Sequence, residues 1–291
     1  MGSGRWTKES FKCYSAKLGR DYADDTGRVS GQTYTARKID KSLDPREFTV
    51  RECVNTPEHP NTIPVILALD VTGSMGEACS ETAAALGVIV SNLYDKITDV
   101  EFCVMGIGDL AYDDAPVQMS QYESDIRIAE ALDKIYMEHG GGGNAFESYT
   151  AAWYMGLKRT KLDCYDLQGR KGIIITMGDE PLNPYLPVKP LNSSTNAKEQ
   201  ADIETRDLYR QASEKFDIYH IAVDSNDDCY SHYAGQIEKS FGQLLGPRYK
   251  VSTINDLAKT IEDCIMDSVN GSCIPPTTTT TTTNSNGEIT W

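Results

Sequence analysis

The fold is decided by the stretch Ile63-Pro64-Val65-Ile66-Leu67-Ala68-Leu69-Asp70-Val71-Thr72-Gly73-Ser74. Its apolar first half predicts a buried strand, and its second half places Asp70, Thr72 and Ser74 at alternate positions behind the strand tip. The aspartate supplies negative charge, and the two hydroxyls supply neutral oxygens. Such a set suits octahedral Mg²⁺ or Mn²⁺, which keeps bound waters and an open position for another ligand. The strand tip is therefore a candidate metal site.

A helix is predicted to follow this loop. Apolar residues recur there at three- and four-residue spacing, which indicates a helix with one face packed on a sheet: Leu86, Ile89, Val90, Leu93 and Ile97. Ser74 and Glu77 also match a Ser-x-x-Glu capping box at the start of this helix. The two roles of Ser74 are compatible, because a hydroxyl oxygen that accepts one hydrogen bond keeps a second lone pair for a metal.

Two later loops carry polar residues at predicted element junctions. The glycine run at 140–143 is followed by Asn144-Ala145-Phe146-Glu147 and then by a helical pattern. The run Gly172-Ile173-Ile174-Ile175-Thr176-Met177 indicates a strand covered by helices on both faces, and Gly178-Asp179 follows it directly. Each loop therefore brings at least one further oxygen ligand to the end of an element.

Together with these two loops, the Asp-x-Thr-x-Ser pattern resembles the metal-ion-dependent adhesion site of the von Willebrand factor type A (VWA) domain family. The resemblance covers about residues 60 to 270. It is closest to intracellular-type members, which carry a Gly-Gly-Gly-(Asp/Asn)-x-x-Glu loop and a Gly-Asp loop. It implies that Asp70, Thr72 and Ser74 ligate Mg²⁺ directly or through water, and that Asp179 ligates through water or balances charge.

The second-loop ligand is left open by this resemblance. Integrin-like members have a threonine after the glycines, whereas this chain has Asn144. Asn144, Glu147 and Thr150 are all candidates for the ligand from this loop.

Strand-like and helical patterns alternate along the rest of the chain. Strands are predicted at 100–107, 218–223 and 249–251, with an antiparallel edge at 116–122; helices are predicted at about 197–216, at 230–245 and near the carboxyl end. Repeated strand–helix units predict an α/β fold with a doubly wound, mostly parallel sheet and helices on both faces. The VWA resemblance implies the same Rossmann-like fold. Ligands of such sheets bind at the carboxyl ends of the strands, so the three loops are expected to converge.

Three parts are predicted along the chain: an N-terminal extension at 1–60, a VWA-like domain at 61–272 and a threonine-rich flexible tail at 273–291. Residues 1–41 hold nine Lys or Arg and five Asp or Glu, whereas the whole chain has a net charge of −15. Two interpretations of this basic arm stay open: it docks a partner, or it rests on the acidic domain of its own chain.

Several functional classes are disfavoured by composition. The acidic balance argues against nucleic-acid binding, because phosphate groups would be repelled. No apolar run has the length of a membrane span, and the amino terminus lacks the apolar core of a signal peptide, so a cytoplasmic protein without membrane contact is expected. The eight cysteines form no Cys-x-x-Cys pair and the four histidines no His-Glu-x-x-His motif, so a zinc site is not predicted.

The expected function is that of a noncatalytic, divalent-metal-dependent protein-binding module. Its cofactor would be Mg²⁺, or Mn²⁺ or Ca²⁺, and its partner would be a protein that presents an Asp or Glu carboxylate to the metal. Two alternatives stay open. The chain is a scaffold subunit of a multiprotein assembly with a vestigial metal site, or it is a haloacid-dehalogenase-like phosphotransferase that is phosphorylated on Asp70. The second alternative is weakened by Val71, which stands where that family has lysine.

Overall fold

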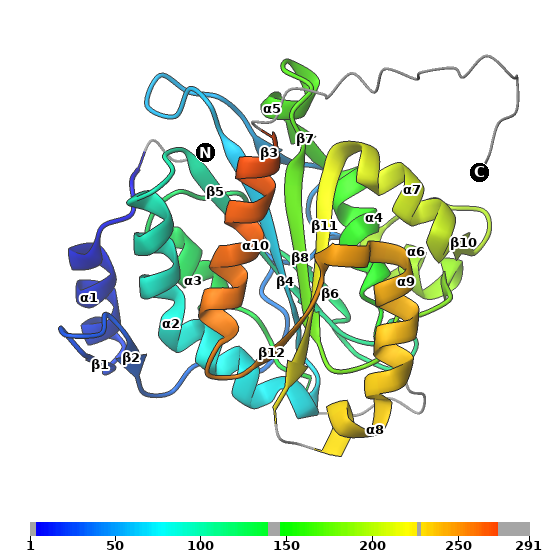
Figure 1. The fold of residues 1–291 in the computed structure, drawn as a ribbon, viewed down its shortest axis with the longest axis horizontal. Helices are drawn as coiled ribbons and strands as arrows, with labels where there is room; N and C mark the ends of the chain where they lie inside the picture. Colours follow the sequence, from blue (N-terminus) through cyan, green and yellow to red (C-terminus); the bar gives the residue numbers. More distant parts are fainter. Residues whose placement is uncertain (1–3, 139–145, 226–227, 273–291) are drawn as a thin grey trace, which may run out of the picture.

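The core of the molecule is a six-stranded sheet with the order β12-β11-β8-β4-β5-β6 (Figure 1). The computed structural model describes residues 4–138, 146–225 and 228–272. The strands are β4 (Ile63–Asp70), β5 (Val100–Ile107), β6 (Val117–Met119), β8 (Gly172–Gly178), β11 (Phe216–Asp224) and β12 (Tyr249–Thr253). All neighbours are parallel except β5 and β6, which are antiparallel. The doubly wound, mostly parallel sheet implied by the resemblance to VWA domains is therefore confirmed.

The strand order reverses between β4 and β8. Along the chain, the sheet grows from β4 outward through β5 to β6 and then restarts on the other side of β4 with β8. Val65 of β4 pairs with Ile173 of β8, and the two strands then run in register as far as Leu69 and Met177. Helices that leave two such strands depart toward opposite faces, and ligands bind in the gap between them. Asp70 and Asp179 both lie at this switch point.

The two faces of the sheet are covered by different sets of helices. Side chains alternate along a strand, so Val65, Leu67 and Leu69 enter one core and Ile66 and Ala68 the other. The first core also contains residues of α2 (Gly76–Tyr94), α3 (Arg127–Asp133) and α10 (Leu257–Ser272). The second contains residues of α4 (Thr150–Arg159), α7 (Thr205–Lys215) and α8 (Asp228–Ile237).

One stretch differs from the expected helix at about 197–216. The structure has a separate helix before this range, α6 (Val188–Thr195), and α7 begins only at Thr205. Asn196 ends α6 in the left-handed conformation (φ 54°), which asparagine tolerates better than most residues. A small antiparallel pair of β9 (Tyr185–Leu186) and β10 (Ile203–Glu204) then fills the space before α7.

The remaining elements are short. A 3₁₀ turn, η1 (Gly73–Met75), precedes α2, and α5 (Asp163–Asp166) follows β7 (Thr160–Leu162), which pairs in parallel with β3 (Arg51–Cys53). After α8, a π-helical turn η2 (Glu238–Gly242) leads through α9 (Gln243–Leu245) and η3 (Gly246–Arg248) to β12. Among the described residues, no helix combines the length and the apolar character that crossing a membrane requires.

The N-terminal segment forms α1 (Lys8–Lys17), β1 (Asp21–Tyr22) and β2 (Val29–Ser30), and it packs on α2 (Figure 1). Its polar sequence gave no helix prediction, because only a few of its side chains are buried in the first core: Trp6, Phe11, Val29 and Tyr34. Arg20 forms a bidentate ion pair with Asp133 of α3, at 2.5 and 2.9 Å. The basic arm thus rests on its own chain through both apolar and ionic contacts. The proposed boundary between an extension and a domain at residue 60 stays a prediction.

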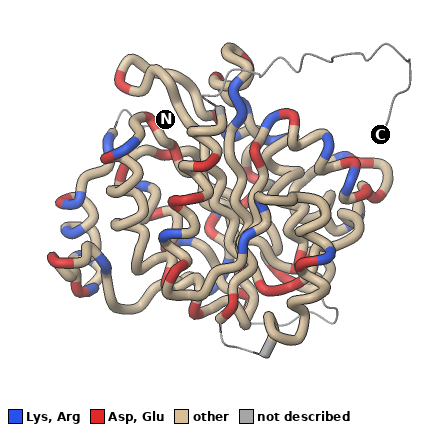
Figure 2. The backbone as a smooth tube through the Cα atoms, in the orientation of Figure 1, with Lys and Arg blue, Asp and Glu red and all other residues tan. Residues whose placement is uncertain are grey.

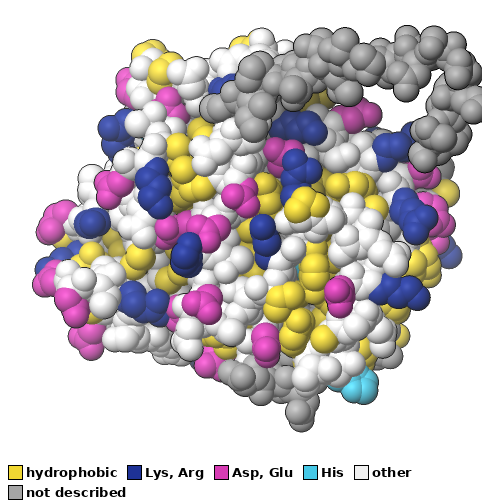
Figure 3. All heavy atoms as spheres, viewed as in Figure 1, with side chains coloured by type: hydrophobic (Ala, Val, Ile, Leu, Met, Phe, Trp, Pro, Cys, Tyr) yellow, Lys and Arg dark blue, Asp and Glu magenta, His cyan; other side chains and the backbone are white. Residues whose placement is uncertain are grey.

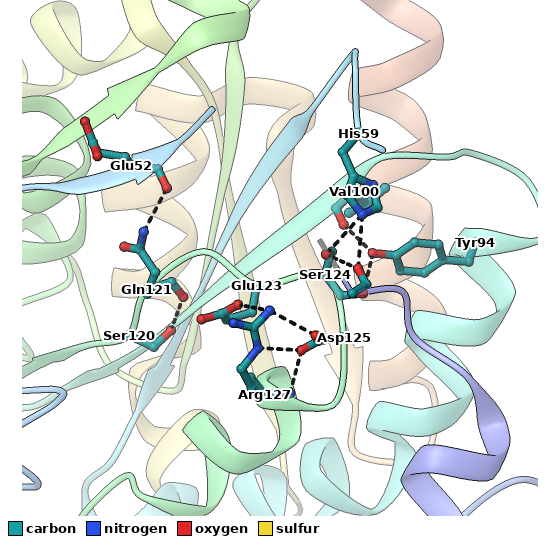
Figure 4. A network of polar contacts seen from close by, with 11 residues as sticks. Glu52, His59, Tyr94, Val100, Ser120, Gln121, Glu123, Ser124, Asp125 and Arg127 are labelled. Atoms are coloured by element: carbon teal, nitrogen blue, oxygen red, sulfur yellow. Dashed lines mark hydrogen bonds and ion pairs between the residues drawn. The ribbon is translucent and has the colours of Figure 1, made fainter. Parts of the chain in front are cut away.

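A polar network fixes the amino terminus beside the first residues of β5 (Figure 4). The buried His59 ring lies with Nε2 3.0 Å from the carbonyl oxygen of Gly4 and Nδ1 3.2 Å from Asp99. Ser124 donates to the same Gly4 carbonyl at 2.6 Å. Because Val100 is the first residue of β5, this network lies at the amino ends of the parallel strands, whereas the candidate metal loops lie at their carboxyl ends. Basic and acidic side chains are interspersed over the face seen in Figure 3.

Candidate metal centre

Asp70, the last residue of β4, is fully buried and organises the first loop. Its Oδ1 accepts hydrogen bonds from the backbone N–H of Thr72 at 3.0 Å and from the Thr72 hydroxyl at 2.5 Å. An aspartate that bonds to the backbone two residues later forms a local turn. The predicted alternation of oxygens is thus realised by a turn that holds the Thr72 hydroxyl against the carboxylate.

Ser74 and Asp179 join the first loop to the third. Asp179 directly follows β8 and is fully buried. The Ser74 hydroxyl donates to Asp179 Oδ1 at 3.1 Å and so links the loops that follow β4 and β8. The expected capping box is wrong: α2 begins at Gly76 after Met75, and no side chain caps its first turn. The Ser74 hydroxyl is directed to the site rather than to the helix backbone.

Tyr149 is a site residue that the sequence analysis missed. Its hydroxyl donates to Asp70 Oδ2 at 2.7 Å, so both oxygens of Asp70 accept hydrogen bonds. The ring passes so close to Gly178 that a Cβ atom built there would lie 1.9 Å from the Tyr149 hydroxyl. No sequence signal marks this role, because an aromatic residue at the start of a helix usually indicates core packing.

The second loop is represented by Glu147 and Thr150, since Asn144 lies outside the described residues. Glu147 is only 3% exposed, and its Oε2 is buried without a hydrogen-bond partner among the described atoms. Thr150 is also buried, but its hydroxyl accepts a hydrogen bond from Nδ2 of Asn183 at 2.7 Å. Of the two described candidates, Glu147 has the oxygen that a bound cation would satisfy.

Burial and mutual repulsion raise the pKa values of the carboxyl groups in this region. The pKa of Asp70 is raised first by burial and then by the charge of Asp179. Burial, followed by Asp70 and Asp179, raises the pKa of Glu180 to about 8. Burial and the charge of Asp70 raise the pKa of Glu147 strongly. Ionising these groups together is costly unless positive charge enters the site.

A fourth loop contributes acidic groups that the sequence analysis did not assign to the site. Asp109 and Asp113 follow β5, and Oδ2 of Asp113 accepts the backbone N–H of Asp109 at 2.7 Å. Burial is the largest cause that raises the pKa of Asp113 to about 6. Both residues also contribute to the raised pKa of Glu147. The acidic turn at 108–114 was visible in the sequence, but its proximity to the other loops depends on the sheet order.

Cys229, near the start of α8, is a further neighbour of the site. Burial, followed by the charges of Asp179 and Glu180, raises the pKa of its thiol to about 12. The thiol is therefore neutral at physiological pH. Its sequence position, far from any other cysteine pattern, gave no indication of this contact.

The donor set fits a hard divalent cation. In the part of the chain that the structure describes, no lysine or arginine forms an ion pair with Asp70, Glu147 or Glu180, although these carboxyl groups lie in a repulsive cluster. Figure 2 shows the same edge of the sheet, at the bottom of the view, with acidic segments at several loops. Among the described residues, no group of three or more His, Cys, Asp or Glu side chains is placed so that these side chains alone could hold a metal ion. The candidate set instead combines carboxylates with the hydroxyls of Thr72 and Ser74, which suits Mg²⁺.

Comparison with known proteins gives structural likenesses only. Neither a family model nor a curated protein matches the sequence. The pilus adhesin SpaC from Lactobacillus rhamnosus GG matches with a TM-score of 0.48 and 12% identity over 77% of this chain, and this chain spans 31% of SpaC. The vWF domain of the type V pili tip protein Mfa5 from Porphyromonas gingivalis matches with a TM-score of 0.46 and 11% identity, over 75% of this chain and 98% of that one. The conserved hypothetical protein BatB from Bacteroides thetaiotaomicron matches with a TM-score of 0.43 and 14% identity, over 72% and 99%.

Proposed function

We propose that this chain is a noncatalytic protein-binding module that engages its partner through a bound divalent cation. The observation that carries the proposal is the meeting of Asp70, Thr72, Ser74 and Asp179 at the carboxyl ends of two adjacent parallel strands. Three of these four residues come from the first loop, and Asp179 comes from more than a hundred residues later. Such convergence at a switch point is the usual place for a ligand in this class of sheet.

Each residue has a defined role in this proposal. Asp70, Thr72 and Ser74 hold Mg²⁺ directly or through water, and Asp179 holds it through water or balances its charge. Glu147 or Asn144 completes the site from the second loop. When bound, the cation neutralises the carboxylates and accepts a carboxylate oxygen of the partner at an open position. Mn²⁺ and Ca²⁺ are further candidates for the same oxygen donors.

The protein supplies positioning rather than bond-making chemistry in this account. The Thr72 turn fixes one oxygen of Asp70, and the Tyr149 hydroxyl fixes the other. Groups that hold metal ligands in this way orient them and strongly influence metal affinity. The expected cytoplasmic location and the partner stay predictions, and the tail expected at 273–291 lies outside the described residues.

The open coordination position is testable with acetate as a stand-in for the partner's carboxylate. We expect Mn²⁺-loaded wild-type protein to broaden the carboxyl carbon signal of ¹³C-labelled acetate beyond the effect of the same free Mn²⁺ concentration. Asp70→Ala should show no enhancement, whereas Asp207→Ala, which alters an exposed aspartate of α7, should behave as wild type. An enhancement equal in the wild type and Asp70→Ala would contradict the proposed site.

A further inference from the structure

A cavity of about 780 Å³ lies beside the loop that carries Asp179. This volume is within the usual range for ligand sites. Its wall combines apolar and basic side chains, among them Phe146, Pro181, Leu182, Arg206, Lys239 and Leu244. Apolar residues in such a wall can bury an apolar side chain of a peptide, and the basic residues can fix the position of the peptide by pairing with an acidic side chain.

Two backbone segments connect the wall of the cavity to the candidate metal centre. Phe146 lines the cavity while the next residue, Glu147, belongs to the buried acidic cluster. Pro181 and Leu182 line it directly after Glu180. A parallel β-bridge between Glu147 and Leu182 joins these two segments. A ligand anchored at the metal would therefore extend naturally into this cavity.

The π-helical turn η2 forms another part of the wall. It contributes Lys239 and Ser240, and the Ser240 hydroxyl accepts the backbone N–H of Leu182 at 3.2 Å. A π-turn inserts an extra residue into a helix, and such insertions are frequent at functional sites. Here the insertion coincides with the helical residues that meet the loop from the metal centre.

Lys239 and Arg206 provide the positive charge of the cavity. Both are exposed, and neither side chain forms an ion pair or hydrogen bond with any residue in the described ranges. Glu204 is the acidic residue on the wall, so the lining has more positive than negative charge. This contrasts with the net charge of −15 for the whole chain. Complementary charge at an interface favours the correct partner and disfavours others.

We propose that this cavity is the specificity subsite for the partner: it binds the residues that flank the metal-bound carboxylate and selects an apolar side chain followed by a second acidic side chain. The inference rests on the proposed function. Pro181, Leu182 and Leu244 receive the apolar side chain, and Lys239 and Arg206 pair with the second acid. The partner segment is thus an acidic, partly apolar stretch of extended peptide rather than an isolated Asp or Glu.

A displayed random-peptide library tests this subsite. It is selected in Mg²⁺ and, separately, in EDTA on four full-length proteins: wild type, Lys239→Glu, Asp70→Ala and the control Lys198→Glu, which reverses an exposed lysine outside the cavity wall. We expect the wild type and Lys198→Glu to enrich peptides with two acidic residues separated by an apolar one, in Mg²⁺ only. Lys239→Glu should lose the preference for the second acid.

An enriched peptide then gives a quantitative cycle. Replacing its second acid by the corresponding amide should weaken binding to the wild type about tenfold in fluorescence polarisation, and it should have little effect on Lys239→Glu. An equal loss in both proteins, peptides with a single acid, or no enrichment on the wild type would overturn the subsite. Enrichment that depends on Lys239 but persists in EDTA and in Asp70→Ala would support the subsite and refute the metal-dependent function.

Discussion

At the residue scale, the Asp70 carboxylate is held by donors from two distant parts of the chain. Thr72 bonds to Oδ1 and Tyr149 to Oδ2. Tyr149→Phe removes only the second donor and keeps the ring that packs near His220 and Phe241. We expect Mg²⁺ affinity to fall about tenfold, because groups that orient metal ligands typically contribute 10- to 100-fold. Calorimetric titration of metal-stripped protein measures this loss.

Tyr154→Phe is the matched control for this substitution. Tyr154 lies on α4, five residues after Tyr149, and its hydroxyl donates to Glu199 at 2.9 Å rather than to the site. The Mg²⁺ affinity of Tyr154→Phe should equal that of the wild type. Equal affinities for Tyr149→Phe and the wild type would show that the tyrosine does not orient Asp70.

Sequence reasoning at this scale succeeded where contacts are local. The alternating pattern was sufficient to place the oxygens of Asp70 and Thr72 together after the strand, because these residues are only two positions apart, and Thr72 donates to Asp70 there. Tyr149 and Cys229 reach the same site from 79 residues away and from the start of α8. Their roles depend on tertiary packing, which residue type and spacing do not encode. The Ser74 capping box failed for the same reason, because a tertiary partner, Asp179, took the hydroxyl.

At the scale of elements, the attachment of α1 to α2 depends on Gly87. A Cβ atom at Gly87 would lie 2.4 Å from the ring of Phe11, which is buried in the first core. We expect Gly87→Ala to displace Phe11 and to lower the free energy of unfolding by about 1–3 kcal/mol, the usual effect of overpacking. Urea unfolding, together with the rate of proteolysis at residues 8–17, measures both effects.

Gly235→Ala provides the comparison for this change. Gly235 lies in α8, and nothing is within 4 Å of a Cβ atom built there. Alanine favours a helix over glycine by about 0.5–1 kcal/mol, so this variant should be unchanged or slightly stabilised. If Gly87→Ala were as stable as Gly235→Ala, α1 would not be anchored through Phe11.

The strands of the main sheet were predictable, whereas several helices were not. Continuous apolar runs such as Ile173–Met177 indicate buried parallel strands because both faces need apolar cover. In contrast, α1 has few apolar positions and gains its stability from docking on α2. The end of α6 depends on the backbone of a single residue, Asn196, and the π-turn of η2 has no sequence period of its own. Local sequence patterns were therefore sufficient to predict the strands of the sheet, whereas these helices depend on tertiary packing.

At the scale of the whole molecule, the acidic cluster links stability to pH. The pKa of Glu180 is raised from its ordinary 4.5 to about 8 by burial and by Asp70 and Asp179, so the folded chain binds more protons than the unfolded chain between these values. Stability in EDTA should therefore fall as pH rises toward about 8. Saturating Mg²⁺ should restore it, with a larger stabilisation at high pH, because the cation replaces the protons.

The pH range of this experiment must avoid a second buried group. Burial lowers the pKa of His220 from 6.5 to about 3, so its protonation on unfolding destabilises the fold as pH falls below 6.5. Thermal unfolding from about pH 6.5 to 8.5 separates the two effects. Glu180→Gln should flatten the dependence in EDTA. A stability that rises with pH in EDTA would contradict the repulsive cluster.

The scaffold alternative also belongs to this scale. Removing residues 1–41 would not isolate a docking arm, because it would take Trp6, Phe11, Val29 and Tyr34 out of the first core. Charge reversal at the exposed Lys8 and Lys17 changes the charge of this segment without changing the core.

The overall architecture was predictable from the sequence: a doubly wound sheet whose candidate metal loops lie where the strand order reverses. The docking of the first sixty residues was not predictable, because it depends on contacts between distant segments.

Calorimetric titration of Mg²⁺ into metal-stripped protein shows whether Asp70 holds a divalent cation. We expect saturable binding to a single site in the wild type and in Asp207→Ala, which alters an exposed aspartate. Asp70→Ala should lose that binding and keep the circular dichroism of the folded protein. Equal binding by the wild type and Asp70→Ala, or no saturable binding to the wild type, would contradict the proposed role of Asp70.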